Sequence, residues 1–267
     1  MARSGFTRRA SPFMSLPIFY FEPGGDAPGG RVKLTGEDAR HLSRSTRAKV
    51  GDRLLVGDGR GTLCRATIAS VQKNEVLALM EAPVRVEKEV PAITVYQAVS
   101  RPSSMDEAVY RAAEAGVDIV VPFISARSGV GAASAAGERV SRWAKIARES
   151  SKVARRAWQL GVNEPLAGPP SADELGGHEL AVVLWEDERE AALSSVLPEG
   201  PPSTVAIVTG PEGGFSTDET LSMVRDGAVA VGLGSLVLRA ETAGAYAAML
   251  VRYSYGLLGA RGRITDE

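Results

Sequence analysis

The sequence predicts an α/β fold in which helices cover a parallel sheet, preceded by a small β-rich module. After residue 91, nearly continuous runs of Val, Ile and Leu alternate with helical segments, which is typical of a parallel sheet buried on both faces. Residues 18–83 instead show short alternating runs broken by glycine, with a hairpin signal at Asp58-Gly59. The length of 267 residues is enough for two cores.

The β-rich part is expected to contain strands at residues 31–34, 53–71 (broken at the hairpin) and 75–80. Its size resembles that of a nucleic-acid-binding barrel. A charged segment bracketed by Pro83 and Pro91 follows, and we interpret residues 84–91 as a linker.

The part after residue 91 is expected to alternate strands and helices. Ser103 or Ser104 is the expected N-cap of the first helix, and Gly116 its stop. The expected strands are 92–100, 118–125, 180–186, 204–210 and 228–234, and the expected helices are 103–117, 138–160, 187–197, 216–227 and 241–257.

Composition excludes several classes of function. Cys64 is the single cysteine and His41 and His178 are the only histidines, so neither a disulfide framework nor a histidine- or cysteine-rich metal site is expected. No apolar run approaches the roughly 20 residues of a membrane helix. Residues 1–16 are basic without an apolar stretch, which indicates a disordered extension rather than a secretory signal, and residues 261–267 are expected to be a tail. We therefore expect a cytoplasmic protein without a membrane partner.

Charge is distributed unevenly along the chain. Residues 1–73 carry 13 Lys/Arg and 6 Asp/Glu, whereas the remaining residues carry 18 and 26. The long helix would place five cations on one face, namely Lys145, Arg148, Lys152, Arg155 and Arg156. Such a face is often merely solvated, but cations without a matching row of carboxylates favour contact with a polyanion such as RNA.

The first candidate motif is the glycine-rich turn Gly210–Gly214, which follows a buried strand. The chain has no phosphate-binding G-x-x-x-x-G-K-[ST] loop and no G-x-G-x-x-G fingerprint, so common nucleotide folds are not predicted. A turn at the carboxyl end of a strand can bind a ligand with its backbone, and Glu212 disfavours a phosphate there. The turn is equally compatible with a tight connection, in which Ser216 and Glu219 form a capping box for the next helix.

The second motif, residues 233–250, places Arg239 and Glu241 between a buried strand and an apolar helix. Together the two motifs resemble the RsmE family of the SPOUT superfamily, whose members carry a GPEGG turn followed by an LG…VLR-ETA segment. Here the second segment is Leu233-Gly234, Val237-Leu238-Arg239 and Glu241-Thr242-Ala243. The stretches 41–59 and 97–128 also match the family, so the resemblance covers most of the chain.

The resemblance implies a fold and a function. The family consists of S-adenosylmethionine-dependent methyltransferases that modify N3 of a uridine in 16S ribosomal RNA of the small subunit. It implies a PUA-like RNA-binding β-barrel at 17–83 and a SPOUT methyltransferase domain with a trefoil knot at 92–260, which pairs as a homodimer through the knot. Two alternatives stay open: another SPOUT RNA methyltransferase acting on a ribose 2′-OH or a tRNA base, and a non-catalytic RNA-binding factor of ribosome assembly.

The resemblance also assigns site residues. Arg239 would be the catalytic cation, with Glu241 or Glu212 as the base or as the partner that orients Arg239; no metal is implied. The residues that would bind the donor are Leu184, Trp185, Glu186, Thr209, Gly210, Pro211, Glu212, Gly213, Gly214, Leu233, Gly234, Val237, Leu238, Thr242 and Ala243. Those that would contact RNA are Arg40, Arg44, Arg47, Lys49, Arg101, Arg127, Lys152 and Arg155.

Overall fold

The computed structural model describes residues 16–21, 30–45, 47–129 and 132–258. The predicted tail and, apart from residue 16, the predicted N-terminal extension lie outside these residues. The chain forms two units. Unit 1 comprises the described residues up to Glu87 together with Arg155–Ala157, and unit 2 comprises Lys88–Ala154 and the described residues from Trp158 on. The domain bounds 17–83, 84–91 and 92–260 stay a prediction.

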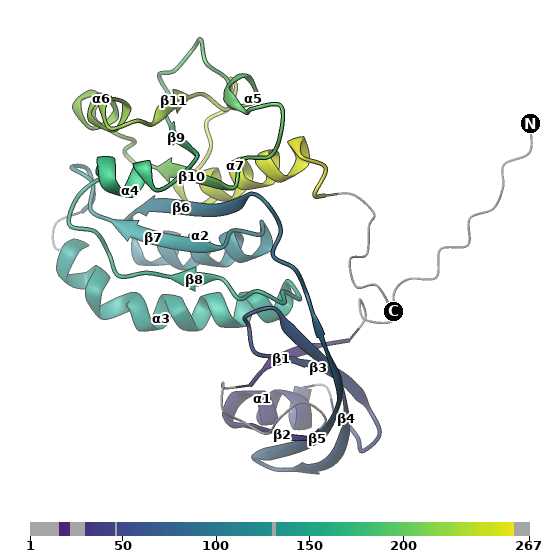
Figure 1. Ribbon diagram of the computed structural model, residues 1–267. Helices are drawn as coiled ribbons and strands as arrows, with labels where there is room; N and C mark the ends of the chain where they lie inside the picture. Colours follow the sequence, from purple (N-terminus) through teal and green to yellow (C-terminus); the bar gives the residue numbers. More distant parts are fainter. Residues whose placement is uncertain (1–15, 22–29, 46, 130–131, 259–267) are drawn as a thin grey trace, which may run out of the picture. The chain divides into compact units, whose positions relative to one another are not determined.

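Unit 1 is a five-stranded sheet in the order β1-β3-β4-β5-β2 (Figure 1). All its neighbouring strands are antiparallel except the parallel pair β1–β3. Alternate residues of the strands, such as Val32 and Leu34, point into one apolar core. The strands are β1 (Ile18–Tyr20), β2 (Arg31–Thr35), β3 (Arg53–Gly57), β4 (Thr62–Gln72) and β5 (Glu75–Arg85).

The hairpin predicted at Asp58-Gly59 is confirmed between β3 and β4. Asp58 Oδ1 accepts hydrogen bonds from Arg60 N at 2.7 Å and Thr62 N at 3.0 Å, which fixes the turn. The helical segment α1 (Gly36–Arg40), continued by the π-helical turn η1 (His41–Ser45), was not predicted, because five-residue helices are too short to show a period. Strand β5 continues to Arg85, two residues into the segment interpreted as a linker.

Unit 2 contains a six-stranded sheet in the order β11-β9-β10-β6-β7-β8, and every neighbouring pair in it is parallel. The predicted α/β class with a parallel sheet is therefore confirmed. Its strands are β6 (Ala92–Ala98), β7 (Ile119–Phe123), β8 (Gly161–Val162), β9 (Leu180–Leu184), β10 (Thr204–Thr209) and β11 (Val229–Val231). The two-residue β8 was not predicted.

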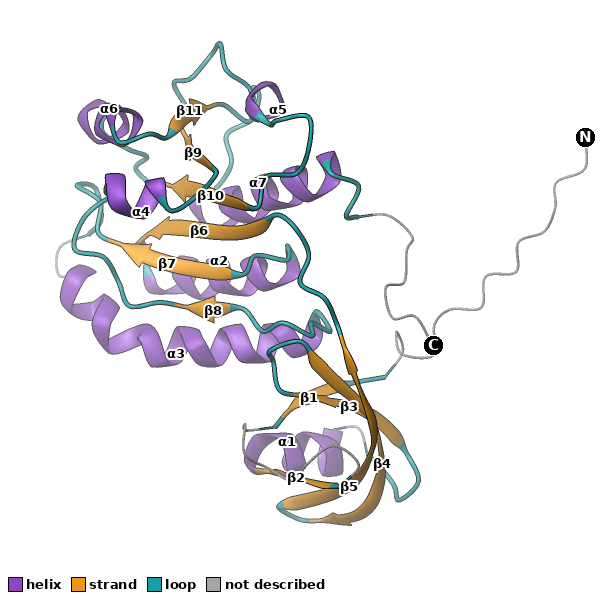
Figure 2. Ribbon diagram, viewed as in Figure 1, coloured by secondary structure: helices purple, strands orange, loops and turns teal. Residues whose placement is uncertain are grey.

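Helices cover both faces of this sheet (Figure 2). On one face Ile93 and Val95 of β6 pack with α2 (Pro102–Glu114), α3 (Ala132–Val153) and α7 (Ala240–Ser254). On the other face Tyr96 and Ala98 of the same strand pack with α4 (Ala172–Gly176) and α6 (Thr217–Arg225). Successive side chains of β6 therefore point alternately into two apolar cores, one on each face of the sheet. No helix in the described part of the chain is long and apolar enough to span a bilayer.

The predicted bounds of three helices were wrong. Helix α2 begins at Pro102, with Arg101 as N-cap in place of Ser103 or Ser104, because proline is pre-organised for the first helical position. Helix α3 runs from Ala132 to Val153, not from residue 138 to residue 160. Arg155 adopts φ +54°, so Arg155 and Arg156 do not share its cationic face. The segment 187–197 contains only the short helix α5 (Leu193–Val196).

The cause of the third error is a side chain that competes with helix formation. Glu188 Oε1 accepts hydrogen bonds from Glu190 N at 2.7 Å and from Ala191 N at 3.0 Å. These bonds hold the start of the segment in a turn. They also lower the pKa of the Glu188 carboxyl below its ordinary value.

Candidate active site

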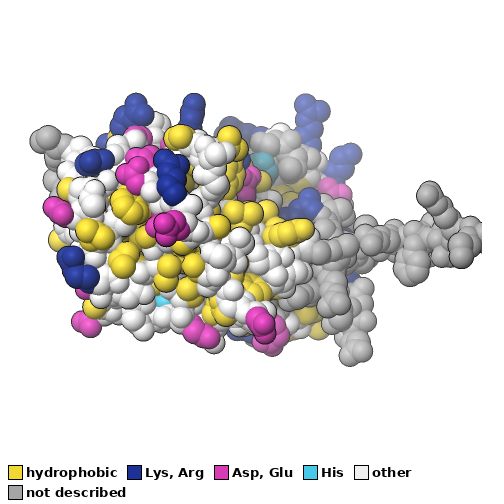
Figure 3. Space-filling model, turned by 90° about the horizontal axis from the view of Figure 1, so that it is seen from above, with side chains coloured by type: hydrophobic (Ala, Val, Ile, Leu, Met, Phe, Trp, Pro, Cys, Tyr) yellow, Lys and Arg dark blue, Asp and Glu magenta, His cyan; other side chains and the backbone are white. Residues whose placement is uncertain are grey.

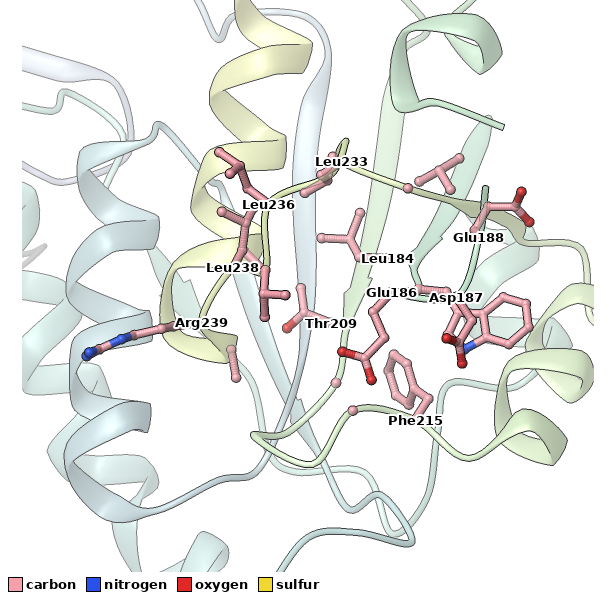
Figure 4. A pocket seen from close by; sticks show the side chains of 18 of the residues that line it. Leu184, Glu186, Asp187, Glu188, Thr209, Phe215, Leu233, Leu236, Leu238 and Arg239 are labelled. Atoms are coloured by element: carbon pink, nitrogen blue, oxygen red, sulfur yellow. The ribbon is translucent and has the colours of Figure 1, made fainter. Parts of the chain in front are cut away.

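A pocket of about 780 Å³ lies at the carboxyl ends of three adjacent strands of unit 2 (Figure 4). Its walls are the loop after β9, the glycine-rich turn after β10, and the segment between β11 and α7. Open α/β sheets bind ligands at such strand ends, because the loops there diverge and leave a crevice. The volume is that of a typical small-molecule site.

The turn after β10 requires glycine. Gly214 has φ +65°, and Gly214 N donates to Pro211 O at 2.9 Å. A Cβ on Gly214 would also lie 2.8 Å from Glu186 Oε1, so the carboxylate would have to move, but the positive φ is the stronger reason for glycine. The capping box is also present, since Glu219 Oε2 accepts from Ser216 N at 3.0 Å. The turn is therefore both a tight connection and a pocket wall.

Two arginines from other segments hold the turn. Arg101 Nε donates to Glu212 Oε1 at 3.0 Å, and Arg127 Nη1 donates to Gly213 O at 2.6 Å. Burial alone would raise the pKa of Glu212, but hydrogen bonds from its own backbone N–H and from Arg101 outweigh burial and lower the pKa below its ordinary value. Glu212 is therefore ionised and paired, which makes it a poor proton acceptor.

Arg239 and Glu241 lie at the start of α7, beside the pocket. Arg239 is the N-cap residue and its side chain is 83% exposed, whereas that of Glu241 is 16% exposed. Arg239 Nη1 lies 3.7 Å from Glu241 Oε1, so the pair is a loose ion pair. Figure 4 shows the Arg239 side chain pointing away from Glu186 and Phe215. The guanidinium is thus free to meet a second molecule at the pocket mouth, and Glu241 restrains its position.

Most of the predicted donor-binding residues meet in this one pocket. Gly213 and Thr242 stand next to lining residues without lining it themselves, and Arg101 lines it although only an RNA contact was predicted. Sequence reasoning missed the lining residues Asp187, Glu188, Arg189, Phe215, Val231, Gly232, Ser235, Leu236 and Ala240. For Asp187, Glu188, Arg189, Ser235 and Leu236, a position directly after a predicted strand was the available signal. Phe215 in addition stacks on Phe123, the last residue of β7, with ring centroids 6.2 Å apart.

The predicted RNA contacts do not all gather in one place. Four of them, Arg40, Arg44, Arg47 and Lys49, are exposed in unit 1, near η1. Arg155 is exposed after the end of α3. Lys152 is only 9% exposed and its Nζ lies 2.7 Å from Glu149 Oε1, which leaves little of it for a phosphate. Arg127 is already bonded to Gly213 O.

The pocket suits an uncharged or cationic ligand with hydrogen-bonding groups. Thr209 Oγ1 is buried and has no hydrogen-bond partner among the described residues, so a ligand can supply one. Glu186, Asp187 and Glu241 give the walls carboxylates, and Leu233, Leu238 and Phe215 give them apolar surface. A sulfonium-bearing nucleoside such as S-adenosylmethionine fits this combination. Among the described residues, no group of three or more His, Cys, Asp or Glu side chains is arranged to hold a metal ion.

Comparison with known proteins agrees with this geometry. The family model described as "RNA methyltransferase domain" matches residues 87–252, and the one described as "RNA methyltransferase PUA domain" matches residues 34–81. The ribosomal RNA small subunit methyltransferases E of Mycobacterium tuberculosis and Bacillus subtilis are both 29% identical. The alignments cover 95% and 84% of this chain and 94% and 91% of those proteins.

Solved structures give the same result. Ribosomal RNA small subunit methyltransferase E from Neisseria gonorrhoeae, bound to S-adenosyl methionine, superimposes with a TM-score of 0.77 at 25% identity, over 89% of this chain and 97% of that one. A Legionella pneumophila methyltransferase with bound cofactor SAM has the same TM-score and identity, over 90% and 98%. The chain therefore belongs to the RNA methyltransferase family, and within it to the RsmE proteins, which are S-adenosylmethionine-dependent enzymes of the SPOUT fold.

Proposed function

We propose that this protein transfers a methyl group from S-adenosylmethionine to N3 of a uridine in 16S ribosomal RNA of the small subunit. The observation that carries the proposal is the pocket itself, where the Gly210–Gly214 turn and the Arg239–Glu241 pair meet at three parallel strand ends. Its relatives are named for ribosomal RNA of the small subunit, which gives the substrate class. Such a substrate places the enzyme in the cytoplasm.

The donor binds between the three loops. Thr209 Oγ1 supplies an unused hydrogen-bonding group, and Leu233 and Leu238 supply apolar contacts to carbon atoms. Glu186 and Glu212 tolerate a positive charge, which a phosphate-binding loop would not. S-adenosylmethionine supplies an activated methyl group, so the chain itself has only to hold the acceptor in line with it and stabilise the charge that develops.

The chemistry of the acceptor uridine determines the role proposed for Arg239. The N3 proton of uridine is weakly acidic, and its loss leaves negative charge on O2 and O4. A cation at the pocket mouth stabilises this charge, and Arg239 is placed there with 83% of its side chain exposed. Glu241, mostly buried in the first turn of α7, orients the guanidinium. An unpaired uridine must enter the pocket, since N3 is blocked in a base pair.

Recognition of the RNA rests on both units. In unit 1, Arg40, Arg44, Arg47 and Lys49 present cations along α1, η1 and the segment that follows. Cations on a small β-module attract the phosphate backbone without reading sequence, so they supply affinity. Arg101 adds exposed positive charge in unit 2, and Arg155 adds it directly after the end of α3.

The methyltransferase domain further acts as a homodimer through α7. This helix is apolar on two sides: Ala245, Ala248 and Val251 face the sheet, while an outward stripe consists of Tyr246, Met249, Leu250 and Tyr253. The stripe lines a groove of about 400 Å³ with Leu233, Leu238 and Leu258. A second copy of this helix would cover the exposed stripe and remove its apolar side chains from water. Figure 3 shows hydrophobic side chains between charged ones on one face of the molecule.

The decisive test uses small ribosomal subunits from a strain that lacks the enzyme. The purified protein is incubated with these subunits and radiolabelled S-adenosylmethionine, and the RNA is digested to nucleosides. Label in 3-methyluridine is the expected result. Label on a ribose or on another base would replace the proposed specificity with that of another SPOUT enzyme, and donor binding without any label would favour a non-catalytic assembly factor.

A further inference from the structure

Glu219 forms more than the capping box of α6. Its Oε2 closes the box through Ser216 N at 3.0 Å, while its Oε1 accepts a hydrogen bond from Ala126 N at 2.7 Å. Ala126 is 93 residues away, in the loop after β7. We propose that Glu219 is a positioning residue for donor binding, because it fixes the Gly210–Gly214 turn against this loop. The inference rests on the proposed function, since it concerns the same pocket.

The loop after β7 is a firm support. Ser128 N donates to Ser125 O at 3.0 Å, which closes a turn with Ala126 in its second position. Ser128 Oγ donates to Val99 O at 2.7 Å and accepts from Ser125 N at 3.1 Å, so the turn is attached to the segment that follows β6. A group bonded to Ala126 N is therefore held against the sheet.

Contacts between this loop and the pocket wall flank Glu219. Arg127 Nη1 donates to Gly213 O at 2.6 Å. Phe123 stacks on Phe215, which lines the pocket, with an interplanar angle of 12°. Of these three contacts, only the one made by Glu219 has its charged group on the α6 side, because in the others the loop supplies the arginine or both partners are rings. It thus sets where the chain leaves the turn and enters the helix.

The electrostatics of Glu219 agree with a double role. Burial alone would raise its pKa, but hydrogen bonds from Ala126 N, Ser216 N and the Ser216 and Ser125 hydroxyls outweigh burial and lower it below the ordinary value. A capping glutamate needs only the bonds from its own helix end. The bonds from residues 125 and 126 are the addition that links two distant segments.

A second capping box in the same unit provides a matched control. In α4, Glu174 Oε2 accepts from Ser171 N at 2.7 Å, as Glu219 does from Ser216 N in α6. Neither glutamate lines the pocket itself, but Glu219 comes four residues after the lining residue Phe215, whereas no residue of α4 lines the pocket. Glu174→Ala therefore removes an equivalent cap without touching the pocket, and it isolates the general cost of losing such a box.

The contact itself can be broken from its other end. Ala126→Pro removes the N–H that Glu219 accepts, and proline is favoured at the second position of a turn. The experiment measures the Kd of S-adenosylmethionine by calorimetry and the steady-state constants with small ribosomal subunits. The proteins are the wild type, Glu219→Ala, Ala126→Pro, the double variant and Glu174→Ala.

We expect Glu219→Ala and Ala126→Pro each to weaken donor binding about tenfold, because each removes a hydrogen bond that involves a charged group. The double variant should be no weaker than Glu219→Ala, since both changes break the same contact. The KM for the donor should rise while kcat at saturating donor stays within about twofold, and Glu174→Ala should bind as the wild type does. A purely structural loss would lower kcat through the folded fraction and leave KM unchanged.

The outcomes separate the two proposals. Wild-type affinity in Ala126→Pro, or strictly additive losses in the double variant, would overturn the role of Glu219 and leave the donor pocket intact. A wild-type protein that binds no S-adenosylmethionine would overturn the proposed function and this inference with it. If Glu219→Ala fails to fold, Ala126→Pro alone still decides the question.

Discussion

Replacing Gly244 by alanine tests how closely α7 approaches the sheet behind the pocket. A Cβ at this position would lie 2.9 Å from Val95 Cγ1 and 3.0 Å from Thr209 Cγ2. Both neighbours are β-branched side chains on buried strands, with few alternative rotamers. The helix must therefore move, which costs about 2–3 kcal/mol, at the upper end for an overpacked core.

The higher helix propensity of alanine opposes this cost, so the sign of the change in unfolding free energy shows which effect is larger. Alanine is favoured over glycine inside a helix by about 1 kcal/mol. For Gly244→Ala the net effect should be a destabilisation of about 1–2 kcal/mol, by difference of these two magnitudes. Gly137 is the matched control, because it lies inside α3 and a Cβ there would meet nothing within 4 Å. Gly137→Ala should therefore stabilise the protein by up to about 1 kcal/mol.

The assay is urea denaturation followed by tryptophan fluorescence. The chain contains 3 tryptophans, Trp143, Trp158 and Trp185, and all belong to unit 2, so the signal reports the unfolding of the unit that carries both glycines. Gly244→Ala should also weaken donor binding, since Thr209 lines the pocket. A Gly244→Ala protein as stable as Gly137→Ala would refute the close approach of α7 to β6 and β10.

Three further predictions follow from the same structure. Arg239→Ala should lower the rate of single-turnover methylation about a hundredfold while donor affinity is retained, whereas Arg225→Ala on α6 should methylate at the wild-type rate. Equal rates in the two variants would show that Arg239 takes no part in catalysis. Leu250→Arg should convert the proposed dimer to a monomer in light scattering after gel filtration, because the exposed stripe of α7 cannot accept a buried charge. An unchanged dimeric mass would place the interface elsewhere. Burial lowers the pKa of His178 from its ordinary 6.5, so the unfolded chain takes up a proton more readily and stability should fall as the pH drops below about 6.5. In His178→Gln the urea midpoint should lose this dependence between about pH 7.5 and 5.5. A midpoint that depends on pH as strongly as in the wild type would assign the effect to other groups.

The parts of the fold that could be predicted are those whose signal lies within one segment. The parallel strands were predictable because residues such as Ile93 and Tyr96 serve opposite faces and make the runs apolar throughout. Helix ends were harder, because Arg101 and Arg155 act through backbone conformation that composition does not express. Segment 187–197 looked helical, and only the bonds to Glu188 Oε1 explain why most of it is not.

The site likewise has features that one segment of the sequence predicts and contacts that it does not. The Gly210–Gly214 turn and Arg239 were visible as motifs. The capping box predicted after the turn is present and the turn lines the pocket, while its binding of a ligand stays a prediction. The contacts that fix the turn join residues far apart in the chain: Arg101 and Glu212 are 111 residues apart, and Arg127 and Gly213 are 86. No local pattern encodes such pairs. Glu219 could be recognised as a cap, but its bond to Ala126 appears only once the sheet brings both segments together.

The position of the pocket along the chain has a consequence for biosynthesis. Apart from Arg101, every residue that lines the pocket lies between positions 184 and 243, whereas the described β-module of unit 1 is nearly complete by residue 87. Because a chain grows from its N-terminus and its domains fold in that order, all strands of the RNA-binding module are made long before any donor site exists. A nascent chain can therefore meet RNA while it is still unable to hold the cofactor, and methylation begins only after α7 has left the ribosome that makes it.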